Sequence, residues 1–261
     1  KKDTIHIATK PMSEQFILGE MLALLIEENS DLHVKITKGV GGGTSNIHPA
    51  MVKGDFDLYP EYTGTGWLVI LKKDTLLPPD QLFSELQKEY SREYGLKWVA
   101  PYGFNNAYSL AVSNEMAKKY NLKTFSDLAL YPALFTFGAE YDFYEINDGY
   151  ADLCAYYNLK FKKNLDMDIG LKYEAMKSGK IDVINIFTTD GQLSHANLTV
   201  LKDDKHFFPS YYCATIVREE TLKEHPELDR ILEKMNGILT DQEMADMNYK
   251  VDVEHRTERE V

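Results

Sequence analysis

Short apolar runs of strand length alternate with longer segments of helical periodicity, and this alternation constrains the fold more than any other feature of the chain. A repeated strand–helix–strand order predicts largely parallel sheets covered by helices. Up to Ala100, the predicted strands are Ile5–Ile7, Val34–Thr37, 56–59 and Trp98–Ala100, and the predicted helices are Ser13–Glu28, a segment that begins near Thr44, and Gln81–Tyr94.

The same alternation restarts beyond residue 107 and predicts a second α/β unit. No Pro- or Ser-rich linker separates the two units, so we expect two lobes, 1–106 plus 208–261 (lobe I) and 107–207 (lobe II), packed across a cleft that suits a small molecule. The predicted strands here are Tyr108–Val112, 134–139, Ile181–Phe187, 198–203 and the segment CATIVRE, and the predicted helices are 115–120, 125–130, Asp148–Tyr157, Met167–Gly179 and the C-terminal section.

Polar residues and glycines mark where these helices begin and end. Ser13 is a predicted N-cap, and Thr44 or Ser45 is the predicted cap of the next helix, because their side-chain oxygens can accept from free backbone N–H groups. Gly95 and Gly179 are expected to stop the helices that precede them.

Charge and cysteine content exclude several classes of protein. The formal net charge is −12, which is unfavourable for binding phosphate backbones, so we expect no nucleic-acid partner. Cys154 and Cys213 are the only cysteines, too few for a disulfide scaffold and insufficient to assign a compartment. No apolar run reaches the roughly 18 residues typical of a transmembrane helix.

The glycine-rich segment GVGGGTSN (39–46) is interpreted as a tight strand-to-helix turn. It lacks the Gly-Lys-Ser/Thr of a phosphate-binding loop and the acidic residue that follows a dinucleotide-binding fingerprint. The alternative is that its backbone N–H groups line the cleft and bind polar ligand atoms.

No group of residues in the sequence requires an enzyme. The histidines have no metal-binding spacing, and no nucleophile-elbow motif is present. The acid pairs Asp55/Asp57 and Glu140/Asp142 could perform acid–base chemistry, but such pairs are more typical of turns and solvated surfaces. We therefore expect no catalytic residues, no metal and no cofactor.

Tyrosine is abundant, with 17 residues, and aromatic residues recur where predicted strands end. Ligands of α/β proteins bind beyond the carboxyl ends of strands, so these aromatics could meet in one site. A quaternary ammonium has no N–H to donate and is held by dispersion and by aromatic faces. Packing is the alternative for each ring. The segments are YPEYTGT (59–65), FNNAYSL (104–110), NIFTTDG (185–191) and FPSYYCA (208–214).

Seven segments, in this order, resemble the osmoprotectant-type substrate-binding proteins of ABC importers, which bind glycine betaine, carnitine, choline and related trimethylammonium compounds. The resemblance covers almost the whole chain, and three segments (KPMSEQ, GAEYDF and NIFTTDGQLS) most resemble the ergothioneine-binding branch. The seven are KPMSEQFILGEMLALLIE, GGGTSNIHPAMVKGDFDLYPEYTGTGW, YGFNNAYSLAV, FGAEYDF, NDGY, MDIGLKYEAMKSGKIDVINIFTTDGQL and VLKDDKHFFPSYYCA.

The resemblance implies a type II periplasmic-binding-protein fold with two lobes that close on the ligand, hinged near 104–107 and 207–210. It implies a membrane permease as partner, a monomer when isolated, and an extracytoplasmic location as a lipoprotein, a permease-fused domain or a periplasmic protein. The aromatic cage of the family corresponds to Tyr62, Tyr108, Phe187 and Tyr211, and other residues that line the pocket correspond to Lys10, Thr65, Asn106 and Asp142.

Two positions depart from the family pattern. Phe187 stands where a tyrosine is usual and keeps the aromatic face without the hydroxyl. Ile146 stands where an arginine usually binds the ligand carboxylate in a bidentate contact. Carboxylate binding would then depend on Lys10, Thr65 or backbone N–H groups. The alternatives are a ligand without a carboxylate, such as choline, or a different amine bound by a sensor of the same fold.

Overall fold

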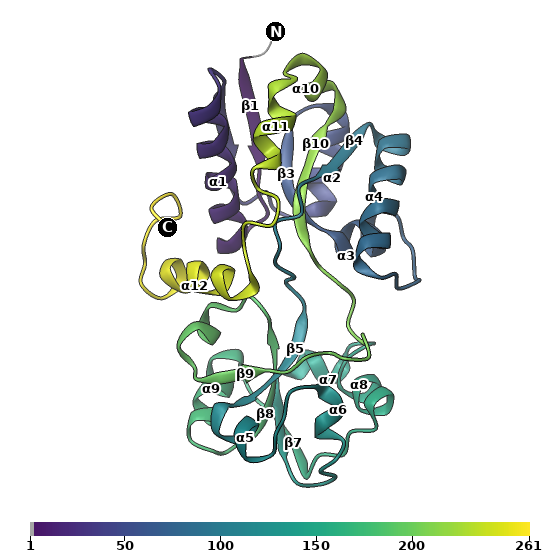
Figure 1. The fold of residues 1–261 in the computed structure, drawn as a ribbon, viewed down its shortest axis with the longest axis vertical. Coiled ribbons are helices and arrows are strands. Elements are labelled where there is room, and N and C mark those ends of the chain that lie inside the picture. Colours follow the sequence, from purple (N-terminus) through teal and green to yellow (C-terminus); the bar gives the residue numbers. More distant parts are fainter. Residues whose placement is uncertain (1–2) are drawn as a thin grey trace. The chain divides into compact units, whose positions relative to one another are not determined.

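The computed structural model describes residues 3–261, and the chain forms two compact units that are connected by two crossings of the backbone (Figure 1). Unit 1 comprises the chain up to Asn106 together with Ser210–Val261. Unit 2 comprises Ala107–Pro209. Each unit therefore has its own sheet, its own helices and its own core.

Unit 1 is built on a five-stranded sheet in the order β2-β1-β3-β10-β4, in which β10 runs antiparallel to both of its neighbours. The strands are β1 (Thr4–Ala8), β2 (His33–Thr37), β3 (Leu58–Tyr62), β4 (Leu96–Val99) and β10 (Cys213–Arg218). The helices are α1 (Ser13–Asn29), α2 (Thr44–Lys53), α3 (Thr63–Thr65), the π-helix η1 (Gly66–Ile70), α4 (Pro79–Tyr94), α10 (Glu219–Glu224), α11 (Glu227–Glu233) and α12 (Asp241–Asp252).

Unit 2 is built on a second five-stranded sheet in the order β7-β6-β8-β5-β9, in which β5 is the antiparallel strand. The strands are β5 (Tyr108–Ser113), β6 (Thr136–Ala139), β7 (Lys163–Asp166), β8 (Val183–Phe187) and β9 (Leu198–Val200). The helices are α5 (Asn114–Lys119), α6 (Phe125–Leu128), α7 (Tyr141–Glu145), α8 (Tyr150–Tyr157), α9 (Ile169–Lys177) and the 3-10 helix η2 (Gly191–His195).

The two sheets have the same topology strand for strand. In each, a first strand (β1 or β6) lies parallel to a second (β2 or β7) and a third (β3 or β8), and an inserted antiparallel strand (β10 or β5) separates the third from the fourth. The expected α/β class with mostly parallel sheets is confirmed.

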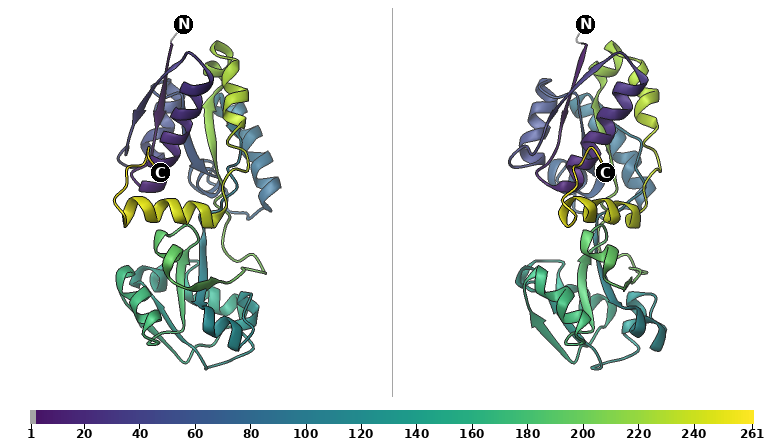
Figure 2. Two further views of the ribbon diagram at one scale, coloured as in Figure 1. Left: turned by 60° about the vertical axis from the view of Figure 1, so that its left-hand side comes forward. Right: turned by 90° about the vertical axis from the view of Figure 1, so that its left-hand side faces the viewer.

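Each unit has apolar clusters of its own that stabilise it by burial. In unit 1, Ile7, Leu22 and Leu232 belong to one cluster, and Tyr59, Leu86 and Trp98 belong to another. Helix α12 packs against α1 within this unit (Figure 2). In unit 2, the larger cluster gathers around Phe137, Phe143 and Val183. The packing of each core holds the strands in place and so fixes the positions of the residues at the strand ends.

The two predicted side-chain caps are wrong. Helix α1 begins at Ser13 with Met12 as the N-cap, and the Ser13 hydroxyl donates to Asp252 of α12 instead. Helix α2 begins at Thr44 with Gly43 as the N-cap, and the Thr44 hydroxyl donates to Glu61. In both cases the hydroxyl, which local sequence rules expect to cap the helix, instead donates a hydrogen bond to a carboxylate that is distant in sequence.

Several parts of the predicted element pattern need correction. The strand expected at 56–59 is Leu58–Tyr62, and directly before it the carboxylate of Asp57 accepts from the His6 backbone N–H and the Thr221 hydroxyl. Strand β7, with the sequence KNLD, lies at an edge of its sheet and carries almost no apolar signal. The π-helix η1 directly after α3 was also unexpected.

Candidate functional site

Five of the predicted site residues lie at one edge of the unit 1 sheet, where the parallel strands have their carboxyl ends. Lys10 follows β1, Tyr62 ends β3, and Thr65 is half-buried in α3, three residues further on. Tyr211 precedes the antiparallel strand β10, and the Asn106 backbone N–H donates to the Tyr211 carbonyl at 3.0 Å. Residues from four different segments of the chain thus lie together at the edge of the sheet where α/β proteins bind ligands.

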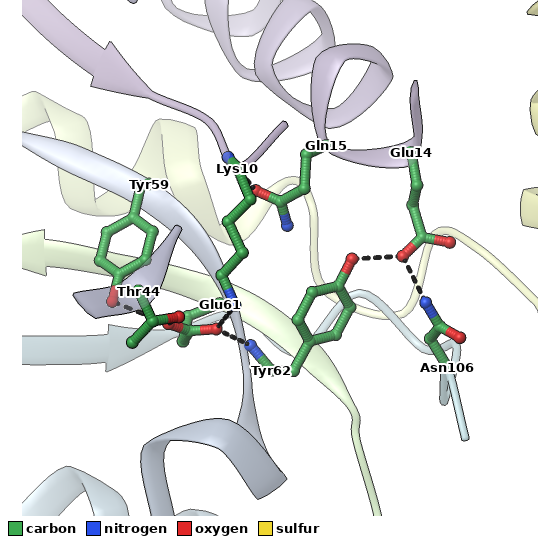
Figure 3. Close-up of polar contacts among 8 residues, drawn as sticks. All are labelled: Lys10, Glu14, Gln15, Thr44, Tyr59, Glu61, Tyr62 and Asn106. Carbon is green, nitrogen blue, oxygen red and sulfur yellow. Dashed lines mark hydrogen bonds and ion pairs between the residues drawn. The ribbon is translucent and has the colours of Figure 1, made fainter. Parts of the chain in front are cut away.

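Lys10 forms an ion pair with Glu61, whose side chain is completely buried (Figure 3). The other carboxylate oxygen of Glu61 accepts from the Thr44 hydroxyl at 2.7 Å and from the Tyr59 hydroxyl at 2.9 Å. Burial, reinforced by the negative charge of Glu61, raises the pKa of Tyr59 well above its ordinary value, so this phenol remains a donor. An ammonium group has three donors, so Lys10 keeps capacity for a ligand oxygen.

Tyr62 is held from several directions. Its hydroxyl donates to Glu14 Oε2, which also accepts from Asn106 Nδ2 at 3.0 Å (Figure 3). The Lys10 ammonium lies 4.9 Å from the centroid of the Tyr62 ring. Burial, followed by the charge of Glu14, raises the pKa of Tyr62 well above its ordinary value. Because only 6% of Tyr62 is exposed, its ring offers a limited surface to a ligand in this conformation.

Tyr211 packs directly over the turn that follows β3. A Cβ added at Gly64 would lie 2.6 Å from Tyr211 Cε1 and 2.7 Å from the Ser210 carbonyl oxygen. Only glycine allows this approach of the ring to the backbone. The Tyr211 backbone N–H donates to Asn105 Oδ1 at 2.7 Å, which fixes the segment before β10.

In unit 2, Tyr108 and Phe187 form a stacked pair. They are opposite each other on the antiparallel strands β5 and β8, their ring centroids are 4.4 Å apart, and the angle between the ring planes is 28°. Tyr108 is supported behind by Phe143 and Phe208, at centroid distances of 5.5 and 5.7 Å. Tyr108 is half-buried and Phe187 is 45% exposed, so an aromatic surface remains open at the carboxyl end of β8.

Asp142 and Ile146 both belong to the region of α7, which follows β6. The side chain of Asp142 is exposed and makes no hydrogen bond or ion pair among residues 3–261. Ile146 is the C-cap of α7 and is 42% exposed, so the position at which the resemblance led us to expect an arginine presents an apolar surface. The structure therefore joins Tyr108 to Phe187, whereas among residues 3–261 the Asp142 side chain makes no hydrogen bond or ion pair to either of them.

The carboxyl edges also contain residues that sequence analysis missed. Glu14 and Glu61 of unit 1 and Lys172 of unit 2 are charged residues with buried side chains, and each contacts a predicted site residue or its immediate neighbourhood. A charged residue inside an apolar strand, such as Glu61 in LYPEY, was the available signal. Such a residue has to find a partner, because an unpaired buried charge is costly.

Three backbone N–H groups of the glycine-rich segment bond within unit 1, two of them to Thr9 and one inside the segment. The Gly39 N–H donates to the Thr9 hydroxyl, the Val40 N–H to the Thr9 carbonyl and the Gly43 N–H to the Val40 carbonyl. The bond from Gly43 to Val40 closes a turn of four residues and supports the interpretation as a tight turn. Within residues 3–261, no cluster of three or more His, Cys, Asp or Glu side chains suits a metal ion. In the same range, no helix combines the length and apolar character that crossing a membrane requires.

Three comparisons place this geometry among known proteins. The chain matches the family described as "Substrate binding domain of ABC-type glycine betaine transport system" over residues 3–261. It is 49% identical over 247 residues to the "Ergothioneine transport permease/ergothioneine binding protein EgtU" of Helicobacter pylori (strain G27), covering 95% of this chain but only 44% of that protein. It therefore spans less than half the length of this relative.

Two further similarities cover most of both chains. The "Carnitine transport binding protein OpuCC" of Listeria monocytogenes is 36% identical over 253 residues, covering 96% of this chain and 82% of that protein. The crystal structure of a "glycine betaine/carnitine/choline ABC transporter" superimposes with a TM-score of 0.92 at 31% identity, covering 98% of this chain and 94% of the other. The expected fold, that of two-lobed type II substrate-binding proteins, is thereby confirmed.

Proposed function

This chain belongs to the family of substrate-binding domains of ABC-type glycine betaine transport systems, and from that premise we propose that it captures a trimethylammonium compound and delivers it to a membrane permease. The observation that carries the proposal is the stacked pair Tyr108–Phe187 with its open aromatic surface. Cation–π attraction is worth about 0.5–2 kcal/mol per contact, and more where water is excluded. Tyr62 and Tyr211 of unit 1 would supply further aromatic contacts to the same ligand.

Ergothioneine, a betaine, is the first ligand to consider. The relative with 49% identity is named for it, and two relatives with 36% identity are named for carnitine. A betaine carries a carboxylate as well as the trimethylammonium group. In the absence of an arginine at 146, that carboxylate would contact the remaining Lys10 donors, Thr65 or Asn106. Choline and glycine betaine complete the ligand class.

The domain would work without catalysis, since substrate-binding domains bind and release their ligand. Acting as a monomer outside the cytoplasm, it would present the ligand to the permease as a lipoprotein, as a domain fused to the permease or as a periplasmic protein. The proposal also requires residues of both units to contact one ligand, with movement at the crossings near 104–107 and 207–210. A ligand that contacts both would favour one arrangement of the units over others.

A second candidate is the binding of a different amine, without a carboxylate, by a sensor of the same fold. Ile146 favours it, because the apolar side chain removes the charge that would bind a carboxylate. A non-quaternary amine that displaces every trimethylammonium ligand would support this candidate over transport of a betaine.

Calorimetric titration of the purified chain with ergothioneine, choline, glycine betaine and carnitine tests the proposal. Binding of a betaine would support the trimethylammonium class and show that its carboxylate is accommodated without an arginine at 146. Binding of choline alone would support the class and assign Ile146 to a site that does not use a carboxylate. No binding of any of the four would overturn the proposed ligand class.

A further inference from the structure

Unit 2 contains a buried lysine that the proposed ligand contacts do not use. The side chain of Lys172, in α9, is 3% exposed, and its ammonium donates to the Glu140 carboxylate. It also donates to the Asn185 backbone carbonyl at 2.7 Å, with Asn185 Oδ1 at 3.4 Å. An ammonium group has three donors, and a buried charge is tolerated only where partners compensate its lost hydration. Lys172 therefore lies at the centre of a fully coordinated polar site.

The three side chains form a closed network. Asn185 Nδ2 donates to Glu140 Oε2 at 2.9 Å, so Glu140 is held by both partners. Glu140 lies between β6 and α7, Lys172 in α9, and Asn185 in β8. The network thus connects three separate elements at the carboxyl edge of the sheet.

Two predicted ligand residues are direct neighbours of this network. Glu140 is the N-cap of α7 and precedes Asp142 by two positions. Asn185 precedes Phe187 by two positions in β8, so their side chains share one face of the strand. Helix α7 has five residues, far fewer than an isolated helix needs, so its orientation depends on tertiary contacts. Glu140 and the buried Phe143 provide those contacts.

Unit 1 contains a counterpart in the topologically equivalent elements. Lys10 follows the first strand, Thr44 opens the helix after the second, and Glu61 lies in the third. In unit 1, Lys10 lies three residues beyond Ile7, the residue of the first strand that pairs with the third strand. In unit 2, Glu140 lies three residues beyond Phe137, which pairs with the third strand of that unit. The loop after the first strand carries the cation in unit 1 and the anion in unit 2. A polar network built around one ion pair thus recurs in equivalent elements, with the partner charge in the third strand in unit 1 (Glu61) and in the helix in unit 2 (Lys172).

We propose that Lys172, Glu140 and Asn185 form a positioning network that holds Asp142 and the end of β8 with Phe187 in the geometry that binds the ligand. The inference rests on the proposed function, because it assigns these residues to the support of that site. Lys172 acts through Glu140 and Asn185 and does not touch the ligand. Side chains that support contact residues in this way usually affect affinity when removed.

Three variants test the network. Lys172→Met removes the cation and leaves Glu140 without its charged partner. The double variant Glu140→Gln/Lys172→Met removes both charges and so relieves that imbalance. Lys177→Met, at an exposed lysine of the same helix, is the matched control. For each, we would measure affinity for the trimethylammonium ligand by calorimetry, the melting temperature, and hydrogen exchange of peptides that cover residues 140–147.

The expected result separates positioning from stability. Lys172→Met should weaken ligand binding by about tenfold or more and increase hydrogen exchange in 140–147 relative to the rest of unit 2. The double variant should recover melting temperature, since no uncompensated charge remains, but should not recover affinity. Lys177→Met should match the parent protein in all three measurements.

Recovery of affinity together with melting temperature in the double variant would overturn the inference, because the network would then be needed only for folding. Parental affinity in Lys172→Met would overturn it as well. If the parent protein binds no trimethylammonium ligand, the proposed function fails. Hydrogen exchange then still tests whether the network holds residues 140–147 in place. Equal hydrogen exchange of residues 140–147 in Lys172→Met and in the parent protein would then be enough to overturn the inference.

Discussion

Tyr108 and Phe187 stack across an antiparallel strand pair with their ring centroids 4.4 Å apart, and each is the terminal residue of its strand at the same edge of the sheet. One face of Phe187 is covered by Tyr108, yet 45% of the residue is exposed. A cation therefore cannot enter between the two rings in this conformation. It can contact the open surface of Phe187, with Tyr108 as the support behind it.

Phe187→Ala should accordingly weaken the binding of a trimethylammonium ligand. The lost cation–π contact corresponds to about a two- to thirtyfold increase in Kd, measured by calorimetry. Val200→Ala, another exposed apolar residue of unit 2, is the control and should bind like the parent protein. Equal Kd values for Phe187→Ala and the parent would remove Phe187 from the site.

Gly64→Ala should disturb the site of unit 1 through Tyr211. The new Cβ would meet Tyr211 Cε1 at 2.6 Å and the Ser210 carbonyl oxygen at 2.7 Å, so the ring and the backbone segment must both move. We expect a loss of about 1–3 kcal/mol in the free energy of unfolding, measured in urea, together with weaker ligand binding. Gly41→Ala is the control, since nothing lies within 4 Å of its added Cβ. Equal losses in both variants would contradict the role of close approach.

Ile146→Arg should introduce the contact to a ligand carboxylate that the resemblance implies for this position. The position is 42% exposed at the end of α7, so a guanidinium can remain hydrated there. A bidentate contact should raise affinity for betaines relative to choline by about tenfold, measured as the ratio of the two Kd values. Ile146→Lys should give a smaller change, because an ammonium is a point charge without the planar fork. An unchanged ratio in Ile146→Arg would place residue 146 away from the ligand carboxylate.

The protein should lose stability at high pH because of its buried phenols. Burial raises the pKa values of Tyr59, Tyr62 and Tyr102 well above the ordinary value, so the folded state keeps these groups protonated. The unfolded chain ionises them near pH 10, so their contribution is present below about pH 10 and is lost as the pH rises further towards the folded-state values. Each such phenol steepens the loss by about 1.4 kcal/mol per pH unit.

Urea unfolding between pH 8 and 11 measures this dependence. Tyr62→Phe should be less stable than the parent at pH 8, because the buried Glu14 loses a donor, but its stability should fall less steeply above pH 10. Tyr141→Phe removes the hydroxyl of a tyrosine that is 60% exposed and is the control for the substitution itself. A slope in Tyr62→Phe equal to that of the parent would show that Tyr62 titrates alike in both states.

Much of the fold follows from local patterns. The alternation of apolar runs with helical periodicity located nearly every strand, and Gly95 and Gly179 end or follow their helices at positive φ as expected. Edge strand β7 was missed because it buries little and so needs no apolar pattern. The caps at Ser13 and Thr44 failed because distant acceptors, Asp252 and Glu61, compete successfully for hydroxyl groups that the helix termini could use.

The candidate site likewise has features that the sequence predicts and features that depend on tertiary contacts. The sequence by itself determined the α/β class, the aromatic residues at strand ends and the absence of an arginine at 146, because strand and helix periodicity and residue identity are local properties. Only the tertiary structure decided that Lys10 pairs with Glu61, that Tyr62 donates to Glu14 and that Lys172 pairs with Glu140. These partners lie 51, 48 and 32 positions apart in the chain. Pairing of buried charges is set by which side chains lose water together, and that depends on how the whole chain folds.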